Sequence, residues 1–174
     1  MNTVKYALAL LALGLVMIGA NAYAQLQAAI TVDFKQPAAN LITGGPPSQA
    51  QLLMLKEAGV TKVINLLGPD ETMAFDEKAE VEALGLKYNA LPISGPTDIT
   101  VDNAKALYQL LQGSDKVFVH CASGNRVGAL LAIGAHEVEG KSVVESLAFG
   151  QAAGLGSLEQ KVQEVLSGQN GGRN

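Results

Sequence analysis

The stretch of sequence that decides the fold reads Val117-Phe118-Val119-His120-Cys121-Ala122-Ser123-Gly124-Asn125-Arg126-Val127-Gly128. Its first three residues are β-branched or aromatic, which predicts a short buried strand that ends at Cys121. Gly124 indicates a tight loop, and an apolar helix is expected from Arg126 to about Glu139. The backbone N–H groups of such a loop converge at a helix N-terminus, and this arrangement binds anions.

Cys121 is the one cysteine of the chain. The convergent N–H groups, the helix N-terminus and the nearby Arg126 guanidinium all favour a negatively charged sulfur, so we predict a reactive thiolate. Arg126 can hold two oxygens of an oxyanion through its planar fork. The alternative is an inert buried thiol, since most free cysteines are buried.

The residues next to Cys121 and Arg126 form the predicted anion-binding loop. His120 either orients the thiolate by a hydrogen bond from the side or only satisfies local backbone groups. The residues expected to surround a bound anion are His120, Ala122, Ser123, Gly124, Asn125 and Val127.

On the N-terminal side of this loop, apolar segments alternate with turn formers in a repeated strand and helix order. A repeated order of this kind favours an α/β fold with a largely parallel sheet flanked by helices, in a single domain. The domain is expected at 41–167, after an N-terminal segment at 25–40. Strands are expected at 41–43, 60–67, 86–91 and 116–120, with helices between Ser48 and Gly59, Phe75 and Gly85, and Thr100 and Gly113.

After the helix that follows the loop, two further helical segments are expected at 142–148 and 157–166. Gly150–Gly156 lies between them and contains three glycines. No Lys-Ser or Lys-Thr pair follows these glycines at a helix start, so we interpret the segment as a flexible connector and not as a nucleotide-binding loop.

The two ends of the chain are interpreted as lying outside the domain. Lys5 precedes an apolar run from Tyr6 to Ala20, and Ala22-Tyr23-Ala24 then gives a small-x-small cleavage pattern, so residues 1–24 are predicted to be a signal peptide. The apolar run is too short to span a bilayer, which takes about 20 residues. We therefore expect a periplasmic or secreted protein. Residues 168–174 are expected to form a disordered tail.

The composition of the mature chain excludes several classes of function. Removal of residues 1–24 takes away Lys5 and no acidic residue, so 11 basic and 16 acidic residues remain and the net charge is −5. Such a surface argues against nucleic acid or anionic membranes as partners. The two histidines and one cysteine are too few for a zinc site, and no acidic cluster indicates calcium. No cofactor is predicted.

Cys-x-x-Gly-x-Arg after a Val-rich strand is similar to the active loop of cysteine-dependent phosphatases and of rhodanese sulfurtransferases. The context, over about residues 38–140, resembles the bacterial phosphatase-like domain of the β-lactamase-hydrolase-like family, which is similar to dual-specificity protein tyrosine phosphatases. The resemblance therefore implies a protein tyrosine phosphatase-like fold. The segments that carry it are 41–48, 59–66, Asp70-Glu71 and His120-Cys121.

The loop departs from the phosphatase pattern in two ways. Tyrosine phosphatases place five residues between the cysteine and the arginine, whereas this chain has only four, the length found in rhodaneses, whose cysteine carries a persulfide sulfur. Phosphatases also have Ser or Thr after the arginine to help the thiolate leave. Val127 stands at this position, and an apolar residue there would slow the breakdown of a phosphoenzyme.

A phosphatase also needs a general acid, which the resemblance places on a loop before the helix that precedes the cysteine strand. Asp98 lies there, although a turn or capping aspartate is the alternative, and Asp102 is the weaker candidate. Glu71 is either the partner that orients Arg126 or an ordinary first-turn acid.

Three functions remain open at this stage. The first is a phosphatase that acts on a small anionic substrate or a phosphorylated protein, with Cys121, Arg126 and Asp98 as catalytic residues. The second is a sulfurtransferase that carries a persulfide on Cys121. The third is a module that binds oxyanions without turnover.

Overall fold

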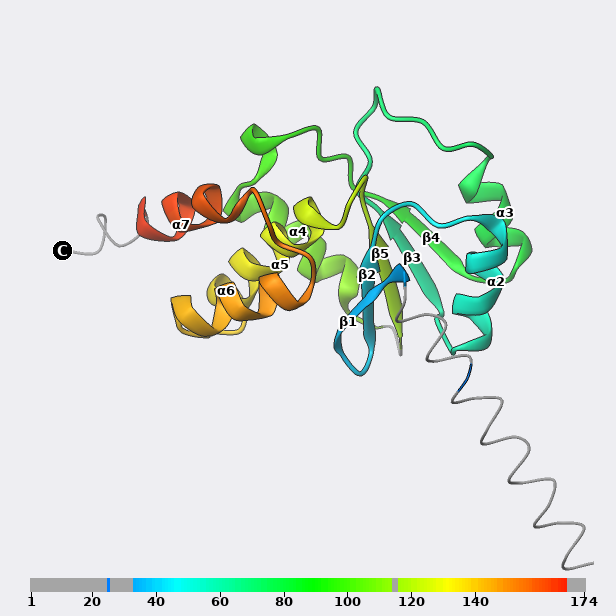
Figure 1. The fold of residues 1–174 in the computed structure, drawn as a ribbon, viewed down its shortest axis with the longest axis horizontal. Coiled ribbons are helices and arrows are strands. Elements are labelled where there is room, and N and C mark those ends of the chain that lie inside the picture. Colours follow the sequence, from blue (N-terminus) through cyan, green and yellow to red (C-terminus); the bar gives the residue numbers. More distant parts are fainter. Residues whose placement is uncertain (1–24, 26–32, 114–115, 169–174) are drawn as a thin grey trace, which may run out of the picture.

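The computed structural model describes residues 25, 33–113 and 116–168, which contain a five-stranded sheet with helices on both faces (Figure 1). The strand order is β1-β2-β5-β3-β4, so β5 lies at the centre. β2, β5, β3 and β4 are parallel, and β1 pairs antiparallel with β2. The strands are β1 (Lys35–Ala38), β2 (Leu41–Gly44), β3 (Lys62–Asn65), β4 (Lys87–Ala90) and β5 (Val117–His120).

This architecture confirms the predicted α/β fold with a largely parallel sheet. His120, the last residue of β5, lies in register with Gly44 of β2 and Asn65 of β3. The carboxyl ends of these three strands therefore meet at one edge of the sheet. In parallel α/β sheets, ligands bind at this edge.

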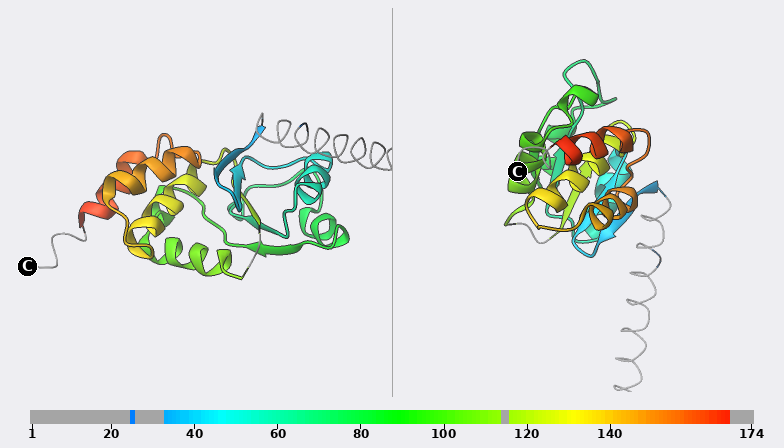
Figure 2. Two further views of the ribbon diagram at one scale, coloured as in Figure 1. Left: turned by 90° about the horizontal axis from the view of Figure 1, so that it is seen from below. Right: turned by 90° about the vertical axis from the view of Figure 1, so that its left-hand side faces the viewer.

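The helices cover the two faces of the sheet as separate groups (Figure 2). α2 and α3 pack with Ile42, Val63 and Phe118 on one face. Ile64 and Val119 face the longer helices on the other side. This alternation along each strand follows from the period of two in a β-strand. The helices are α2 (Gln49–Glu57), α3 (Glu77–Ala83), α4 (Val101–Leu111), α5 (Asn125–Glu137), α6 (Val143–Ala152) and α7 (Glu159–Gly168), with a 3₁₀ turn η1 (Pro96–Asp98).

Local capping signals explain why the predicted helix boundaries hold. Ser48 and Gln51 form a reciprocal capping box at the start of α2. Gly59 follows this helix with a φ of 89°, a left-handed conformation that favours glycine. At α4 the Thr100 side chain accepts a hydrogen bond from the backbone of Asn103.

Strand β1 lies inside the N-terminal segment 25–40, where no strand was predicted. Lys35-Gln36-Pro37-Ala38 has no apolar alternation that would indicate a strand. The strand forms because the turn at 39–40 folds it back onto β2, where Ala38 lies opposite Leu41. The strand therefore forms because of its pairing with β2 and not because of its own sequence.

The prediction of a flexible connector at Gly150–Gly156 is wrong, because these residues are packed. α6 continues to Ala152, and the Ala153 carbonyl accepts a buried hydrogen bond of 2.9 Å from the Thr43 hydroxyl. A Cβ on Gly150 would lie 2.7 Å from the Gly128 carbonyl oxygen, and one on Gly154 would lie 3.1 Å from the Gly124 oxygen. Here glycine allows close backbone approach and does not confer flexibility.

The predictions for the chain ends fall largely outside the described part. The predicted signal peptide, 1–24, and residues 169–174 of the predicted tail are not among the described residues, and Gly168 is the last residue of α7. Within 25, 33–113 and 116–168, no helix has the length and apolar character needed to cross a membrane.

Candidate active site

Cys121 lies directly after β5 at the carboxyl edge of the sheet, and only 1% of its surface is exposed. Its backbone N–H donates to the Gly44 carbonyl across the strand pair, over 3.3 Å. The Gly124 N–H donates to Sγ of Cys121 over 3.2 Å. The loop therefore folds back over the sulfur, and the Gly124 backbone donor points at it.

Gly124 fixes the shape of this loop. Its φ of 83° is left-handed, and a Cβ at this position would lie 3.5 Å from the Gly44 α-carbon. α5 begins at the next residue, Asn125. A residue with a side chain would be strained in this conformation, although its Cβ would meet β2 only at an ordinary contact distance.

Arg126, in the first turn of α5, is 9% exposed and is held by a bidentate ion pair. Its Nη1 and Nη2 donate to the two carboxylate oxygens of Glu71 over 2.6 and 2.7 Å. Nη1 also donates to the Ile93 carbonyl. Of the two roles that the sequence left open for Glu71, the structure therefore has the one in which it orients Arg126.

The ion pair leaves part of the guanidinium available. A guanidinium has five N–H donors, and these three hydrogen bonds use three of them. Nε and the second N–H of Nη2 form a second parallel pair of donors, and the Arg126 side chain also hydrogen-bonds the Cys121 side chain. Hydrogen bonding to Glu71, and to a smaller extent the proximity of Cys121, raises the pKa of Arg126. The remaining donors can therefore bind an oxyanion beside Sγ.

The same ion pair gives a pH-dependent contribution to stability. Hydrogen bonding to Arg126 lowers the pKa of Glu71. The contribution is fully present above the ordinary glutamate pKa of about 4.3, and it is lost as the pH falls through the lower folded value. We expect the difference in unfolding free energy between wild type and Glu71→Gln to be largest near pH 6–7 and to shrink below about pH 4, as measured by urea denaturation.

Glu82→Gln is the matched control, because Glu82 is exposed and makes only a 4.0 Å surface pair with Lys78. A Glu71→Gln effect that stayed constant from pH 7 to pH 3 would contradict the role assigned to this ion pair.

The His120 imidazole points away from the sulfur. Its Nε2 lies 2.8 Å from Oε1 of Glu77, and both side chains are at most 2% exposed. The ring stacks on Phe118, with ring centroids 5.5 Å apart. Among the described residues no hydrogen bond joins His120 to Cys121. The side chain therefore belongs to a buried polar cluster beneath α3 and does not line the predicted anion site.

Glu77 links His120 to two further side chains that the sequence did not single out. Oε2 of Glu77 accepts from Nδ2 of Asn65 over 2.7 Å, and the same Nδ2 lies 3.1 Å from the Tyr88 hydroxyl. Oδ1 of Asn65 accepts from the Leu67 backbone over 2.7 Å. The cluster thus joins β5 to the loop that carries Glu71.

The other predicted binding residues differ in what they offer. Ala122 and Ser123 are exposed. Val127 is fully buried, in the same core cluster as Cys121. Oδ1 of Asn125 accepts from Gly156 over 2.8 Å, and its Nδ2 donates to Ser157 over 2.7 Å. The Asn125 side chain therefore attaches the loop to the segment after α6.

We predict that Asn125→Ala destabilises this attachment. Loss of these hydrogen bonds should lower the free energy of unfolding by about 1–2 kcal/mol and speed hydrogen exchange of the Gly156 amide. Gln160→Ala, which removes one exposed amide contact to Glu164, serves as the control. Unchanged Gly156 exchange in Asn125→Ala would contradict this anchoring role.

Asp98 is the last residue of η1, and its Oδ2 accepts from the Ser94 backbone N–H over 2.7 Å. This is the turn-forming contact that the sequence analysis offered as the alternative to general acid. Its loop is joined to the site at Ile93, whose carbonyl accepts from Arg126. Asp102 lies in the first turn of α4. The role of Asp98 as an acid stays a prediction.

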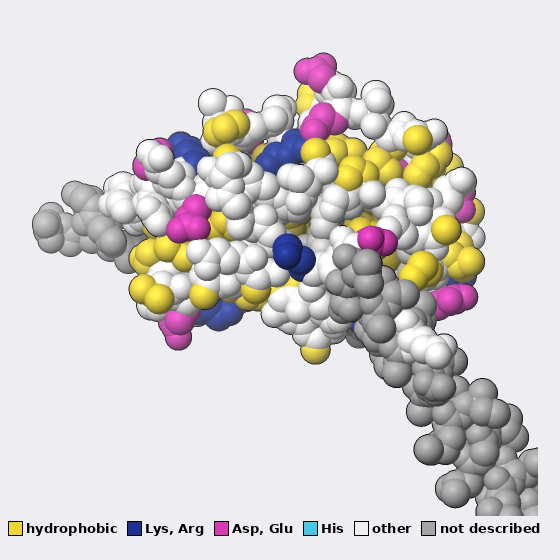
Figure 3. Space-filling model, in the orientation of Figure 1, with side chains coloured by type: hydrophobic (Ala, Val, Ile, Leu, Met, Phe, Trp, Pro, Cys, Tyr) yellow, Lys and Arg dark blue, Asp and Glu magenta, His cyan; other side chains and the backbone are white. Residues whose placement is uncertain are grey.

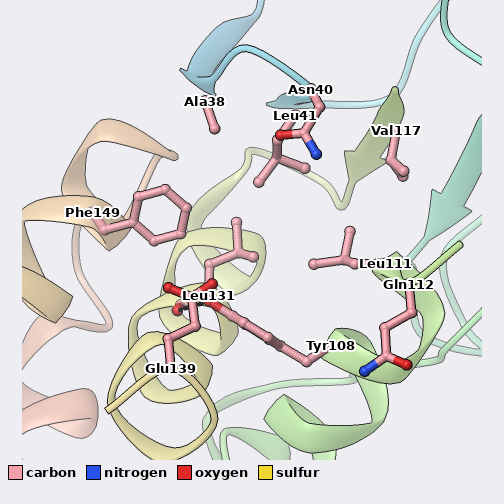
Figure 4. Close-up of a pocket in the computed structure, with 10 residues that line it drawn as sticks. All are labelled: Ala38, Asn40, Leu41, Tyr108, Leu111, Gln112, Val117, Leu131, Glu139 and Phe149. Carbon is pink, nitrogen blue, oxygen red and sulfur yellow. Dashed lines mark hydrogen bonds between the residues drawn. The ribbon is translucent and has the colours of Figure 1, made fainter. Parts of the chain in front are cut away.

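A cavity of about 240 Å³ lies at the opposite edge of the sheet (Figure 4). Leu41 and Val117, the first residues of β2 and β5, contribute to it, together with Tyr108, Leu131 and Phe149. Burial raises the pKa of Tyr108. The cavity is therefore separate from the Cys121 loop. In the described part of the chain, no group of three or more potential ligand side chains could hold a metal ion.

Comparison with known proteins supports the resemblance seen in the sequence. No protein-family model matches the chain. A Beta-lactamase hydrolase-like protein of Agrobacterium fabrum is 29% identical over 98 residues, which is 54% of this chain and 23% of that protein. The matched region thus spans about a quarter of the length of this curated relative.

The fold is shared with several solved phosphatase structures. A DUF442 protein of Shewanella putrefaciens, described as a phosphatase, is 24% identical with a TM-score of 0.58, over 78% of this chain and 91% of that chain. A Neisseria meningitidis protein of the same description has a TM-score of 0.63 at 19% identity, over 75% and 96%. Tk-PTP in its active form has a TM-score of 0.62 at 18% identity, over 80% and 97%. The chain therefore has the fold of the protein tyrosine phosphatase-like phosphatases, and its resemblance to the β-lactamase-hydrolase-like family is confirmed.

Proposed function

We propose that the chain is a cysteine-dependent phosphatase that hydrolyses phosphate monoesters. The Cys121 thiolate attacks phosphorus, the bond from phosphorus to the ester oxygen breaks, and a phosphocysteine forms. Water then attacks this intermediate, which releases phosphate and regenerates the thiolate. The substrate class is a small anionic ester or a phosphorylated protein.

One observation carries this proposal. Cys121 lies under a loop whose Gly124 amide points at Sγ, beside an arginine that Glu71 holds in place and that also hydrogen-bonds the Cys121 side chain. Fixed donors of this kind stabilise the negative charge that gathers on the equatorial oxygens in the transition state. Because Glu71 orients the guanidinium in advance, this stabilisation needs little reorganisation.

Asp98 is proposed as the general acid that protonates the leaving alkoxide or phenoxide. Support comes from its loop, which is joined to the Arg126 guanidinium through Ile93. To act, the Asp98 carboxyl has to release its hydrogen bond from Ser94 or donate through its other oxygen.

Sulfur transfer is the second candidate, and the loop itself favours it. Only four residues separate Cys121 from Arg126, and the buried Val127 offers no hydroxyl to a leaving thiolate. In this reaction the thiolate attacks the outer sulfur of thiosulfate, sulfite leaves with the bonding electrons, and a persulfide remains on Cys121. A sulfur acceptor such as cyanide then removes this sulfur.

A side-by-side assay separates these candidates. Wild type and Cys121→Ser are compared for hydrolysis of an aryl phosphate and for transfer from thiosulfate to cyanide, with mass spectrometry of Cys121 after each substrate. Cys121-dependent phosphate release and a phosphate adduct are expected. Sulfur transfer without phosphate release would replace the phosphatase with the sulfurtransferase. Anion binding without either reaction would leave a non-catalytic module.

We also propose that the protein acts in the periplasm or outside the cell. The support is the signal-peptide pattern at residues 1–24. Mass spectrometry of the protein from its native host should find Gln25 at the N-terminus. An uncleaved chain in the cytoplasm would contradict this location.

A further inference from the structure

A groove of about 440 Å³ lies between the segment that leads into α2 and the segment that leads into α3. Its lining residues come from 46–51 and 72–75, and none of them carries a formal charge. Figure 3 shows hydrophobic side chains gathered along the upper right of this face, next to acidic side chains. The predicted chemistry of the Cys121 loop does not use this groove.

Both walls of the groove are continuous with residues that contact the Cys121 loop. One wall starts at Pro46, and a Cβ on the preceding Gly45 would lie 3.4 Å from the Ala122 carbonyl oxygen. The other wall starts at Thr72, directly after Glu71, which holds Arg126. The groove therefore lies between two segments that each follow a residue in contact with the Cys121 loop or with Arg126.

The side chains of Ser48, Gln49 and Gln51, three of the polar residues that line the groove, already have partners. Ser48 and Gln51 bond each other's backbone N–H groups in the capping box, and Nε2 of Gln51 donates to Asp33 over 2.8 Å. Nε2 of Gln49 donates to Glu80 over 3.0 Å. The groove consequently offers a ligand mainly the apolar surfaces of Pro46, Met73 and Phe75.

The charges around the groove are acidic. Asp33 and Glu80 bind its glutamine side chains from outside, and Asp70 and Asp76 lie in the segment on either side of 72–75. A second anionic group placed in the groove would meet like charge, which disfavours polyanionic ligands. An uncharged apolar group meets no such penalty, and its burial is favourable.

We propose that this groove binds an uncharged, apolar organic group that is attached to the anion held at the Cys121 loop. The inference rests on the proposed function only in that it takes this loop as the oxyanion site. It narrows the substrate class to monoesters of apolar alcohols or phenols, with one anionic group and a hydrophobic body. Met73, Ala74 and Phe75 are the specificity residues.

The test compares methylphosphonate with octylphosphonate as non-hydrolysable probes, titrated into ¹⁵N-labelled Cys121→Ser protein. Both probes should shift the amide signals of 122–125, and only octylphosphonate should shift those of Met73, Ala74 and Phe75. Octylphosphonate should bind about 10-fold more tightly, the gain expected from burying about two methylene groups. Equal affinities, or loop shifts without shifts at 73–75, would overturn the proposal.

Two variants test whether the groove residues cause the tighter binding of octylphosphonate. Ala74 is exposed, so Ala74→Glu should abolish the 10-fold preference without unfolding the protein, and Phe75→Ala should reduce it. Leu53→Ala is the control, because Leu53 is a 47% exposed apolar residue of α2 outside the groove. A preference that survives both groove variants would overturn the proposal. This binding pattern, combined with no hydrolysis of an aryl phosphate by the wild-type protein, would refute the phosphatase and leave the groove proposal intact. Absence of any shift would overturn both the groove and the oxyanion site.

Discussion

An Arg126→Ala variant is expected to lose about 1,000-fold in kcat/KM for an aryl phosphate, the scale of losses seen when a key transition-state donor is removed. Arg126→Lys should lose about 100-fold, because lysine keeps the charge but lacks the two parallel donors. The physical reason is that some N–H donors of the guanidinium bind Glu71 while the others are proposed to bind the anion. Lysine cannot serve both at once.

In the same kcat/KM measurement, Glu71→Gln separates the effect of orienting the Arg126 side chain from the effect of its charge. It leaves Arg126 in place but replaces a bidentate carboxylate with an amide, so a loss of about 10-fold in kcat/KM is expected. Urea denaturation of each variant checks that the fold persists. If Arg126→Ala stayed within 10-fold of wild type, Arg126 would only join the loops at 68–71 and 93, and the proposed anion contact would be wrong.

The sequence predicted the fold where local signals act alone. The apolar strands and the capping residues Ser48 and Thr100 decide structure within a few residues, and these elements were placed correctly. Strand β1 was missed because its pairing depends on β2. The connector at Gly150–Gly156 was misread because a glycine that permits a turn and one that permits close packing look identical in sequence.

The candidate site shows the same division between local and distant contacts. The loop from Cys121 to Arg126 could be predicted because its residues are adjacent in sequence. Glu71 was a candidate partner for Arg126, but it lies 55 residues away, and only the fold decides between its two roles. Glu77 gave no signal, since it follows the N-cap Asp76 and resembles an ordinary first-turn acid, yet it is 3% exposed and pairs with His120.

The largest loss of stability from a single methyl group is expected at Gly128, in α5 directly behind the loop. A Cβ there would lie 2.6 Å from the Gly150 carbonyl oxygen and 2.7 Å from the Leu155 α-carbon. These are backbone atoms, so no side-chain rotation relieves the clash. Gly128→Ala should therefore lower the free energy of unfolding by about 3 kcal/mol, the upper part of the range for overpacked cores.

The effect should reach the site, because relief of the clash requires the segment after α6 to move. That segment holds Asn125 through the Gly156 N–H, so Gly128→Ala should also slow alkylation of Cys121 or change its pH dependence. Gly156→Ala is the matched control, because a Cβ there meets only Oδ1 of Asn125 at 3.9 Å and the backbone N–H is kept.

Urea denaturation measures the stability of both variants, and iodoacetamide kinetics measure the reactivity of Cys121 in each. If Gly128→Ala were as stable as Gly156→Ala, the close packing of α5 against α6 would not support the loop. An unstable Gly128→Ala with unchanged alkylation would instead show that Cys121 is held by β5 and Gly124, without help from the segment after α6.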